Sequence, residues 1–286
     1  YYTDVGKFSR GGTTFRNAKD EQFGPVNLQQ ALTVSSDAYF YTVGNEFWNV
    51  WNSGDHERGL GIQSEARALG FGSPTGIELD ENDGRVPDPA WKSAFAHANY
   101  KSAKAKKDNS QWYPGDDILS AVGQGDVAVT PLQLANAYAA FANGGTLWQP
   151  HIEDRVVDAR GHVVSVTKKH AIRRLALDPT VTATIMAGMQ GSVALSNGTA
   201  NAAFQGFNLT QFPIAGKTGT AQVNGKGDTS LFAAIFTAKG KQYVAVAVVE
   251  QAGFGAQTAA PIVRNIIESM TGQHPGPVQV VGSGHD

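Results

Sequence analysis

Apolar residues at helical spacing mark the clearest predicted helices. Along residues 132–141 they follow the i, i+3, i+4 pattern of a half-buried helix. Thr130 precedes this stretch as a cap, Pro131 takes the first helical position, and Asn-Gly-Gly at residues 143–145 ends it. Asp-Pro at residues 178–179 repeats that start, and the apolar face after it consists of Val181, Ile185, Met186 and Met189.

Three further stretches are predicted to be helical. Residues 27–34 and 38–48 form two of them, separated by a short polar junction. A third runs from about residue 258 to 270, where we expect Ile262, Ile266 and Ile267 to be buried. Gly/Pro-rich residues follow from Gly272, so we predict that 273–286 is a disordered tail after a domain over 1–272.

The pattern changes to strands between residues 217 and 250. Residues 231–237 and 243–249 are rich in β-branched and aromatic side chains, and the turn-like Lys-Gly-Lys at 239–241 separates them. With residues 214–222 before them, they predict an antiparallel meander. Helices first and strands last favour an α+β layered fold over a doubly wound sheet.

Composition narrows the function classes. The chain has 286 residues, 41% of them apolar, which is enough for a large core. A net charge of −2 gives no electrostatic reason to expect nucleic acid, and the basic cluster in a polar, loop-like stretch is predicted to be solvated surface: Lys101, Lys104, Lys106 and Lys107. No apolar run approaches the roughly 20 residues of a membrane span. Absence of cysteine excludes disulfides and thiolate chemistry, and the histidines lack metal-ligand spacing, so we expect no metal and no cofactor.

A polar run opens the strand region. Lys217, Thr218, Gly219 and Thr220 lie together within residues 214–222. One interpretation is a lysine that is simply solvated on a surface strand. The other is the edge of a catalytic cleft, since a cation, two hydroxyls and a glycine suit a substrate that brings a carboxylate and lays its backbone along the strand.

The junction between the first two predicted helices carries Ser35, Ser36 and Asp37. One interpretation is a helix cap, because short hydroxyls and carboxylates satisfy free backbone N–H groups there. In the other, Ser35 and Asp37 face a cleft, where the hydroxyl passes a proton to a leaving amine and the carboxylate holds the network in place. The two interpretations are compatible.

Taken in order, these motifs resemble the penicillin-binding transpeptidases, whose sites combine a serine-x-x-lysine helix, a serine-x-asparagine loop and a lysine-threonine-glycine strand. Residues 69–79, residues 121–126 leading into Thr130, and residues 198–200 are similar to the class B group. The resemblance covers most of residues 20–270. Aspartate at position 37 in place of the usual asparagine resembles the penicillin-binding protein 2 type, which works in cell elongation.

The resemblance implies the fold and the chemistry. The fold would be a penicillin-binding transpeptidase/serine β-lactamase-like α+β fold, with an antiparallel sheet flanked by helices and a mostly helical subdomain. A serine would attack the D-alanyl-D-alanine end of a peptidoglycan stem peptide and pass the acyl group to an amine of a neighbouring strand. β-Lactams would acylate the same serine.

Residue roles follow from the same resemblance. Lys217 would supply the electrostatics of the cleft, and the hydroxyls of Thr218 and Thr220 would grip the terminal carboxylate. Gly219 would let the peptide approach, and the backbone N–H of Thr220 would be one oxyanion-hole donor. Ser35 and Asp37 would complete the proton relay.

The nucleophile is the point of departure from the family. Its serine-x-x-lysine element belongs upstream of Ser35, and nothing in residues 1–34 fits it. The single match in the chain runs from Ser165 to Lys168, after that loop, and we reject Ser165 as the nucleophile. We therefore expect the domain to be N-terminally incomplete, its nucleophile to lie outside this chain, and the chain alone to be inactive.

The resemblance also implies a place and partners. The whole protein would work on the outer face of the bacterial cytoplasmic membrane, held by an N-terminal transmembrane helix that this chain lacks. It would bind stem peptides and β-lactams, work with a membrane glycosyltransferase, and bind no nucleic acid. Two alternatives stay open: a D,D-carboxypeptidase or β-lactamase relative that passes the acyl group to water, and a non-catalytic penicillin-recognising sensor or scaffold.

Overall fold

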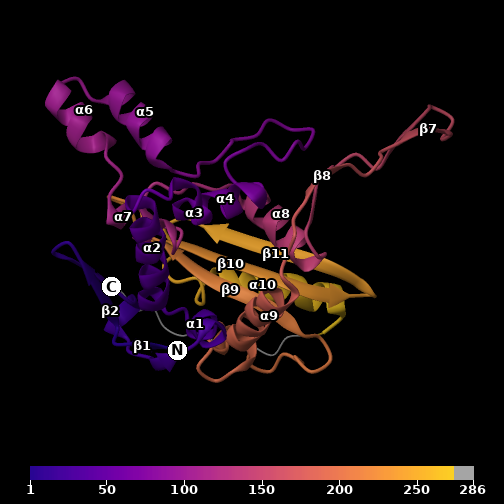
Figure 1. Cartoon of the computed structure of the whole chain (residues 1–286). Helices are drawn as coiled ribbons and strands as arrows, with labels where there is room; N and C mark the ends of the chain where they lie inside the picture. Colours follow the sequence, from indigo (N-terminus) through magenta and orange to yellow (C-terminus); the bar gives the residue numbers. More distant parts are fainter. Residues whose placement is uncertain (274–286) are drawn as a thin grey trace.

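The computed structural model describes residues 1–273, and its centre is a three-stranded antiparallel sheet (Figure 1). The strands are β9 (Ile214–Ala221), β10 (Thr229–Ala238) and β11 (Lys241–Val249), in the spatial order β11-β10-β9. The predicted meander is therefore confirmed, including the tight turn between β10 and β11. Apart from residue 273, the predicted tail lies outside the described residues.

Helices cover both faces of this sheet. On one face, α10 (Ala259–Thr271) packs on β10 and β11, where Phe232, Ala234 and Phe236 point toward it. On the other face, Ala215 and Ile235 contact apolar side chains of α8 (Pro131–Ala142) and α9 (Pro179–Ala194). Successive strand residues point to opposite faces. The middle strand β10 is therefore buried on both sides.

The predicted starts of α8 and α9 are confirmed. Thr130 caps α8 in a capping box with Gln133, and Asp178 caps α9 by accepting a hydrogen bond from the backbone N–H of Val181. Each helix has its proline in the first turn, where the missing N–H costs no hydrogen bond.

The prediction for α10 was right in its position and partly wrong in its buried face. Ile267 is fully buried, but Ile262 and Ile266 are each 40% exposed. Arg264 and Glu268 of the same helix are both buried, and their side chains form an ion pair at 2.7 Å. The buried side of α10 therefore holds this ion pair, while two of the three isoleucines expected inside are partly exposed.

The N-terminal region contains short strands that the sequence pattern did not predict. Two antiparallel pairs form here: β1 (Tyr2–Asp4) with β4 (Gly24–Val26), and β2 (Lys7–Arg10) with β3 (Thr13–Arg16), with the 3-10 turn η1 (Ala18–Asp20) between β3 and β4. The predicted helices follow as α1 (Leu28–Val34) and α2 (Asp37–Asn52). Since α1 packs on α9 and α9 packs on β9, the α1–α2 junction is brought to the sheet.

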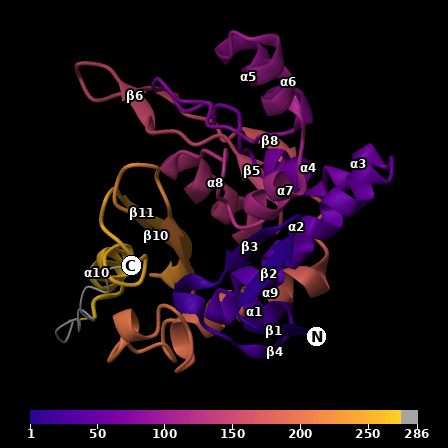
Figure 2. The ribbon, with the colours of Figure 1, turned by 90° about the vertical axis from the view of Figure 1, so that its left-hand side faces the viewer.

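A mostly helical region extends from α2. It comprises α3 (His56–Gly59), α4 (Gly61–Ala68), α5 (Pro89–Asn99), α6 (Ala103–Ser110) and α7 (Pro114–Ser120). Figures 1 and 2 show α5 and α6 side by side at the periphery. The basic cluster expected in a loop lies largely in α6, because Ser102 caps this helix and Lys104 pairs with Asp108 one turn away. Lys101, Lys104 and Lys107 are exposed, as predicted, and Lys106 is half-buried.

The remaining described elements are short. Strand β5 (Thr146–Trp148) pairs with β8 (Ala171–Arg174), and β6 (Arg155–Val157) pairs with β7 (Val163–Val166) in an exposed hairpin that projects from the body (Figure 1). A 3-10 turn, η2 (Ala202–Phe204), packs against α10. No helix within residues 1–273 has both the length and the apolar character of a membrane span.

Candidate active site

Lys217 is the centre of the candidate site. It lies where β9 changes from buried residues to half-buried ones, on the edge strand of the described sheet. Its ammonium donates hydrogen bonds to the hydroxyl of Ser35 at 2.7 Å and to the backbone carbonyl of Thr218 at 2.8 Å. The structure therefore joins the two polar runs found in the sequence, which are 182 residues apart.

The α1–α2 junction contains the predicted helix cap, and the hydroxyl before it contacts Lys217. Ser36 is the N-cap of α2, and its hydroxyl accepts a hydrogen bond from the backbone N–H of Tyr39. Ser35 ends α1 in the left-handed conformation, with φ of 56°. For a residue other than glycine this conformation is uncommon. It leaves the Ser35 hydroxyl beside Lys217.

Asp37, the first residue of α2, supplies a second charge. Burial raises the pKa of Asp37 to about 6; the positive charge of Lys217 opposes this rise and the negative charge of Asp4 adds to it. Burial also lowers the pKa of Lys217 to about 8, against the opposing effect of Asp37. Groups that titrate near neutral pH within one cluster are typical of catalytic sites.

The hydroxyl and carbonyl groups after Lys217 are held by side chains from two other segments. Thr199 shares a hydrogen bond of 2.8 Å with the hydroxyl of Thr218, and Gln124 donates to the carbonyl of Thr220 at 3.1 Å. Neither Thr199 nor Gln124 was assigned a role from the sequence. The sequence signal that could have found them is that Thr199 lies in residues 198–200 and Gln124 in residues 121–126, two segments that resemble the class B group.

The open edge of β9 presents backbone donors. In an antiparallel strand, the N–H and C=O of one residue point to the same side. The carbonyls of Thr218 and Thr220 bond to side chains that lie beyond this edge, those of Lys217 and Gln124. The N–H groups of Thr218 and Thr220 therefore face the open edge as well.

Gly255, in the loop between β11 and α10, packs directly on β9. A Cβ at this position would lie 2.3 Å from the carbonyl oxygen of Leu231 and 2.6 Å from that of Gly219. Because both are backbone atoms, they cannot turn aside. We expect Gly255→Ala to lower the free energy of unfolding by about 1–3 kcal/mol, measured by urea denaturation. Gly227→Ala is the control, since its Cβ would have no neighbour nearer than 3.5 Å. Equal unfolding midpoints for the two variants would contradict this account of Gly255.

Ser165 lies far from this cluster. It is in β7, paired with Val156 in the exposed β6–β7 hairpin, which points away from β9 (Figure 1). The position of this hairpin keeps Ser165 away from Lys217, in line with its rejection as nucleophile.

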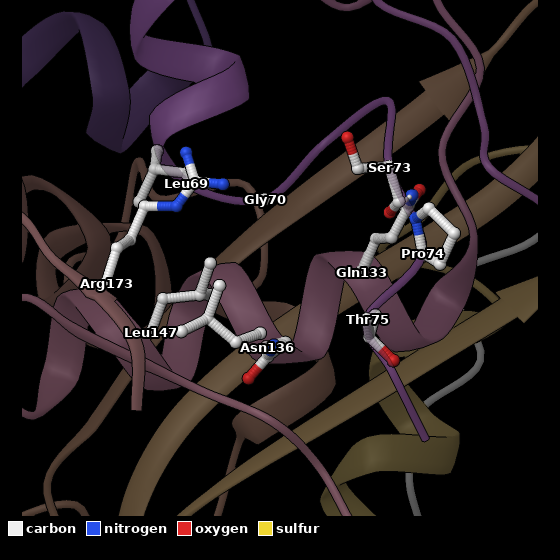
Figure 3. A pocket seen from close by; sticks show the side chains of 10 residues that line it. Leu69, Gly70, Ser73, Pro74, Thr75, Gln133, Asn136, Leu147 and Arg173 are labelled. Atoms are coloured by element: carbon white, nitrogen blue, oxygen red, sulfur yellow. Dashed lines mark hydrogen bonds between the residues drawn. The ribbon is translucent and has the colours of Figure 1, made fainter. Parts of the chain in front are cut away.

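A small pocket at the start of residues 69–79 lies in another part of the fold (Figure 3). Gln133 of α8 holds this segment by donating from its amide to the carbonyls of Ser73 and Asp83. Thr75 and Pro74 line the same pocket. The segment therefore docks on α8 and does not contribute to the cluster around Lys217. Among residues 1–273, no group of three or more histidine, aspartate or glutamate side chains is placed to hold a metal ion.

Comparison with known proteins defines the class. A family model described as "Penicillin binding protein transpeptidase domain" matches residues 2–268, so the chain belongs to this family. The chain is 30% identical over 272 residues to the peptidoglycan D,D-transpeptidase MrdA of Haemophilus influenzae, covering 89% of this chain and 38% of that protein. It is 31% identical to the MrdA of Acinetobacter baumannii over 228 residues, covering 77% of this chain and 29% of that protein.

Comparison with solved structures indicates the same family. Penicillin-binding protein 2 of Pseudomonas aeruginosa, in complex with WCK 5153, superimposes with a TM-score of 0.70 at 28% identity, over 94% of this chain and 55% of that one. Penicillin-binding protein 2 of Helicobacter pylori gives 0.69 at 25% identity, over 95% and 44% of the two chains. The predicted fold class and the resemblance to the penicillin-binding protein 2 type are both confirmed. The chain spans well under half the length of the two curated relatives.

Proposed function

We propose that this chain is part of a peptidoglycan D,D-transpeptidase that cross-links stem peptides through a serine acyl-enzyme and is inhibited by β-lactams. The observation that carries the proposal is the contact of Lys217 with Ser35, beside Asp37 and at the open edge of β9, in a chain of the transpeptidase family. The acylated serine would come from a part of the protein outside these residues.

The proposed roles are those that the resemblance to the family implies. A stem peptide lies along β9 as an added strand and bonds to the N–H groups that face the open edge. The hydroxyls of Thr218 and Thr220 bind its terminal carboxylate, and Gly219 leaves room for its backbone. The N–H of Thr220 stabilises the oxyanion, an interaction whose loss typically costs about 10²- to 10³-fold in rate. Ser35, hydrogen-bonded to Lys217, passes a proton to the leaving amine.

The direct test is the reaction of the whole protein with a stem peptide that ends in D-alanyl-D-alanine. Release of D-alanine together with a cross-linked dimer supports the transpeptidase. Release of D-alanine without a dimer would instead favour the carboxypeptidase alternative. Neither product, and no penicillin adduct by intact mass, would favour the non-catalytic sensor. Protein acylated beforehand with penicillin is the matched control.

The pH dependence of acylation is a second prediction. If the ionised Asp37 and the protonated Lys217 are the working forms, the acylation rate of the whole protein rises as pH passes about 6 and falls as it passes about 8. Asp37→Asn should remove the rise in rate near pH 6, which is the acidic limb of the pH profile, because no carboxyl group is then left at this position to titrate. A fluorescent penicillin measures the rate across the pH range. An acidic limb that survives in Asp37→Asn would contradict the assignment.

Place and partners are proposed on the same basis. The likeness extends to a chain of a solved peptidoglycan synthase complex that coordinates polymerization and crosslinking, with a TM-score of 0.72 at 26% identity over 96% of this chain and 42% of that one. This supports work outside the cytoplasm, where peptidoglycan lies, with a membrane glycosyltransferase as partner. Co-purification of the whole protein with a glycosyltransferase from membranes would test it.

A further inference from the structure

A buried polar network lies behind the α1–α2 junction. Asp4, Asn17 and Ser36 are 1%, 3% and 0% exposed. The Asp4 carboxyl group accepts hydrogen bonds from the Ser36 hydroxyl, from the Asn17 amide at 2.9 and 3.0 Å, and from the backbone N–H of Gly6 at 2.6 Å. Both oxygens of this buried group therefore have partners.

Asn17 carries the network to the other side of Asp37. Its side-chain oxygen accepts a hydrogen bond from the backbone N–H of Ala38 at 2.7 Å, and its amide also donates to the carbonyl of Glu21 at 2.8 Å. Asp4 holds Ser36 and Asn17 holds Ala38, so the residues before and after Asp37 are each fixed. Such a fully satisfied buried network selects one conformation of the backbone it holds.

Local capping does not explain this arrangement. Ser36 already caps α2 through the N–H of Tyr39, so the helix start does not need Asp4. Asp4 also brings a like charge toward Asp37, which is unfavourable for the ionised pair. Three groups thus act on or respond to the charge of Asp37: Lys217 from β9, Asp4 from β1, and Tyr41 from its own helix.

We propose that Asp4 and Asn17 are positioning residues of the site: they fix the α1–α2 junction so that the Ser35 hydroxyl and the Asp37 carboxylate face Lys217. The inference rests on the proposed transpeptidase function. It adds two residues from the unpredicted N-terminal strand region, neither of which touches substrate. Ser35 keeps its left-handed conformation because the residue that follows it is anchored.

The test uses the whole protein and the variant Asp4→Asn, which keeps the size of the side chain but removes its charge. It also replaces one of the two oxygens that accept hydrogen bonds from Asn17 with an NH₂ group, which is a donor. We expect acylation by a fluorescent penicillin at pH 7 to fall by about 10- to 100-fold, as for a small misplacement of catalytic groups. The acidic limb of the pH profile should also move to lower pH, because the like charge near Asp37 is gone. A structural role alone would not move this limb.

The matched control is Asp117→Asn. Asp117 is equally buried, but it accepts its hydrogen bonds from Gln63 and Trp112 and from neither Ser36 nor Asn17. It should lower the urea midpoint while the acidic limb stays in place. If Asp4→Asn fails to fold, Ser36→Ala tests the same anchor, and a rate loss of at least about ten-fold is expected.

Two failures can be told apart. Wild-type protein that penicillin does not acylate would overturn the proposed function. Wild-type protein that is acylated, with Asp4→Asn matching its rate and its acidic limb, would overturn only the positioning role. The same holds for a folded Ser36→Ala variant that keeps the wild-type rate.

Discussion

Lys217→Ala is expected to lower β-lactam acylation of the whole protein by about 10²- to 10³-fold, the range seen when a preorganised electrostatic group is removed from an active site. The ammonium touches the hydroxyl of Ser35 and the carbonyl of Thr218, so its loss frees both from their partner. The free energy of unfolding should change little. Burial already disfavours the charged form of Lys217, as its lowered pKa of about 8 shows, so truncation also removes an unfavourable term.

The measurement is the second-order rate constant with a fluorescent penicillin, next to urea denaturation of the same samples. Lys226→Ala is the matched control, because Lys226 lies in the exposed turn between β9 and β10. It should acylate like the wild type. Near-normal acylation of Lys217→Ala would remove Lys217 from the site.

Arg264→Ala should have the largest effect on stability, a loss of about 3–5 kcal/mol in the free energy of unfolding. Arg264 is 1% exposed and bonds to Glu268 at 2.7 Å and to the carbonyls of Ala203 and Gln205 at 2.9 and 3.0 Å. Its removal leaves a buried carboxylate without its counter-charge and two carbonyls without a donor. Urea denaturation of the whole protein measures the loss.

Two further variants separate the causes. Arg58→Ala breaks an exposed ion pair with Asp55 and should cost less than about 1 kcal/mol. Arg264→Met combined with Glu268→Leu removes both buried charges, and it should recover most of the stability lost in Arg264→Ala. If the double variant is no more stable than Arg264→Ala, the loss comes from packing and not from the unpaired carboxylate.

The elements that the sequence predicted well carry strong local signals. Helix α8 has its cap, its proline and its terminal glycines within the segment itself, and β10 and β11 have β-branched runs with a tight turn between them. Strands β1 and β4 lack such signals, since each has three residues and finds its partner across the chain, with Tyr2 opposite Val26. Short strands of this kind exist only through their pairing, which no local window contains.

The buried face of α10 shows a second limit. Hydrophobicity placed Ile262 and Ile266 inside, but the buried side includes Arg264 and Glu268. A buried arginine is tolerated only where a counter-charge and carbonyl acceptors meet it. Two of the acceptors of Arg264 are backbone carbonyls of η2 and of the residue after it, about 60 residues earlier in the chain. Only tertiary packing brings these carbonyls close to Arg264.

The sequence by itself determined which chemical groups the site has and in what order they occur, from Ser35 and Asp37 to Lys217 and the threonines after it. Only the tertiary structure decided that Lys217 meets Ser35, that Thr199 and Gln124 hold the edge of β9, and that Asp4 and Asn17 anchor the residues around Asp37. The hydrogen bonds and the shifted pKa values of the site depend on how close its groups lie and how deeply they are buried. The packing of α1 on α9 and of α9 on β9 sets both the distances and the burial, because it joins residues that are far apart in the chain.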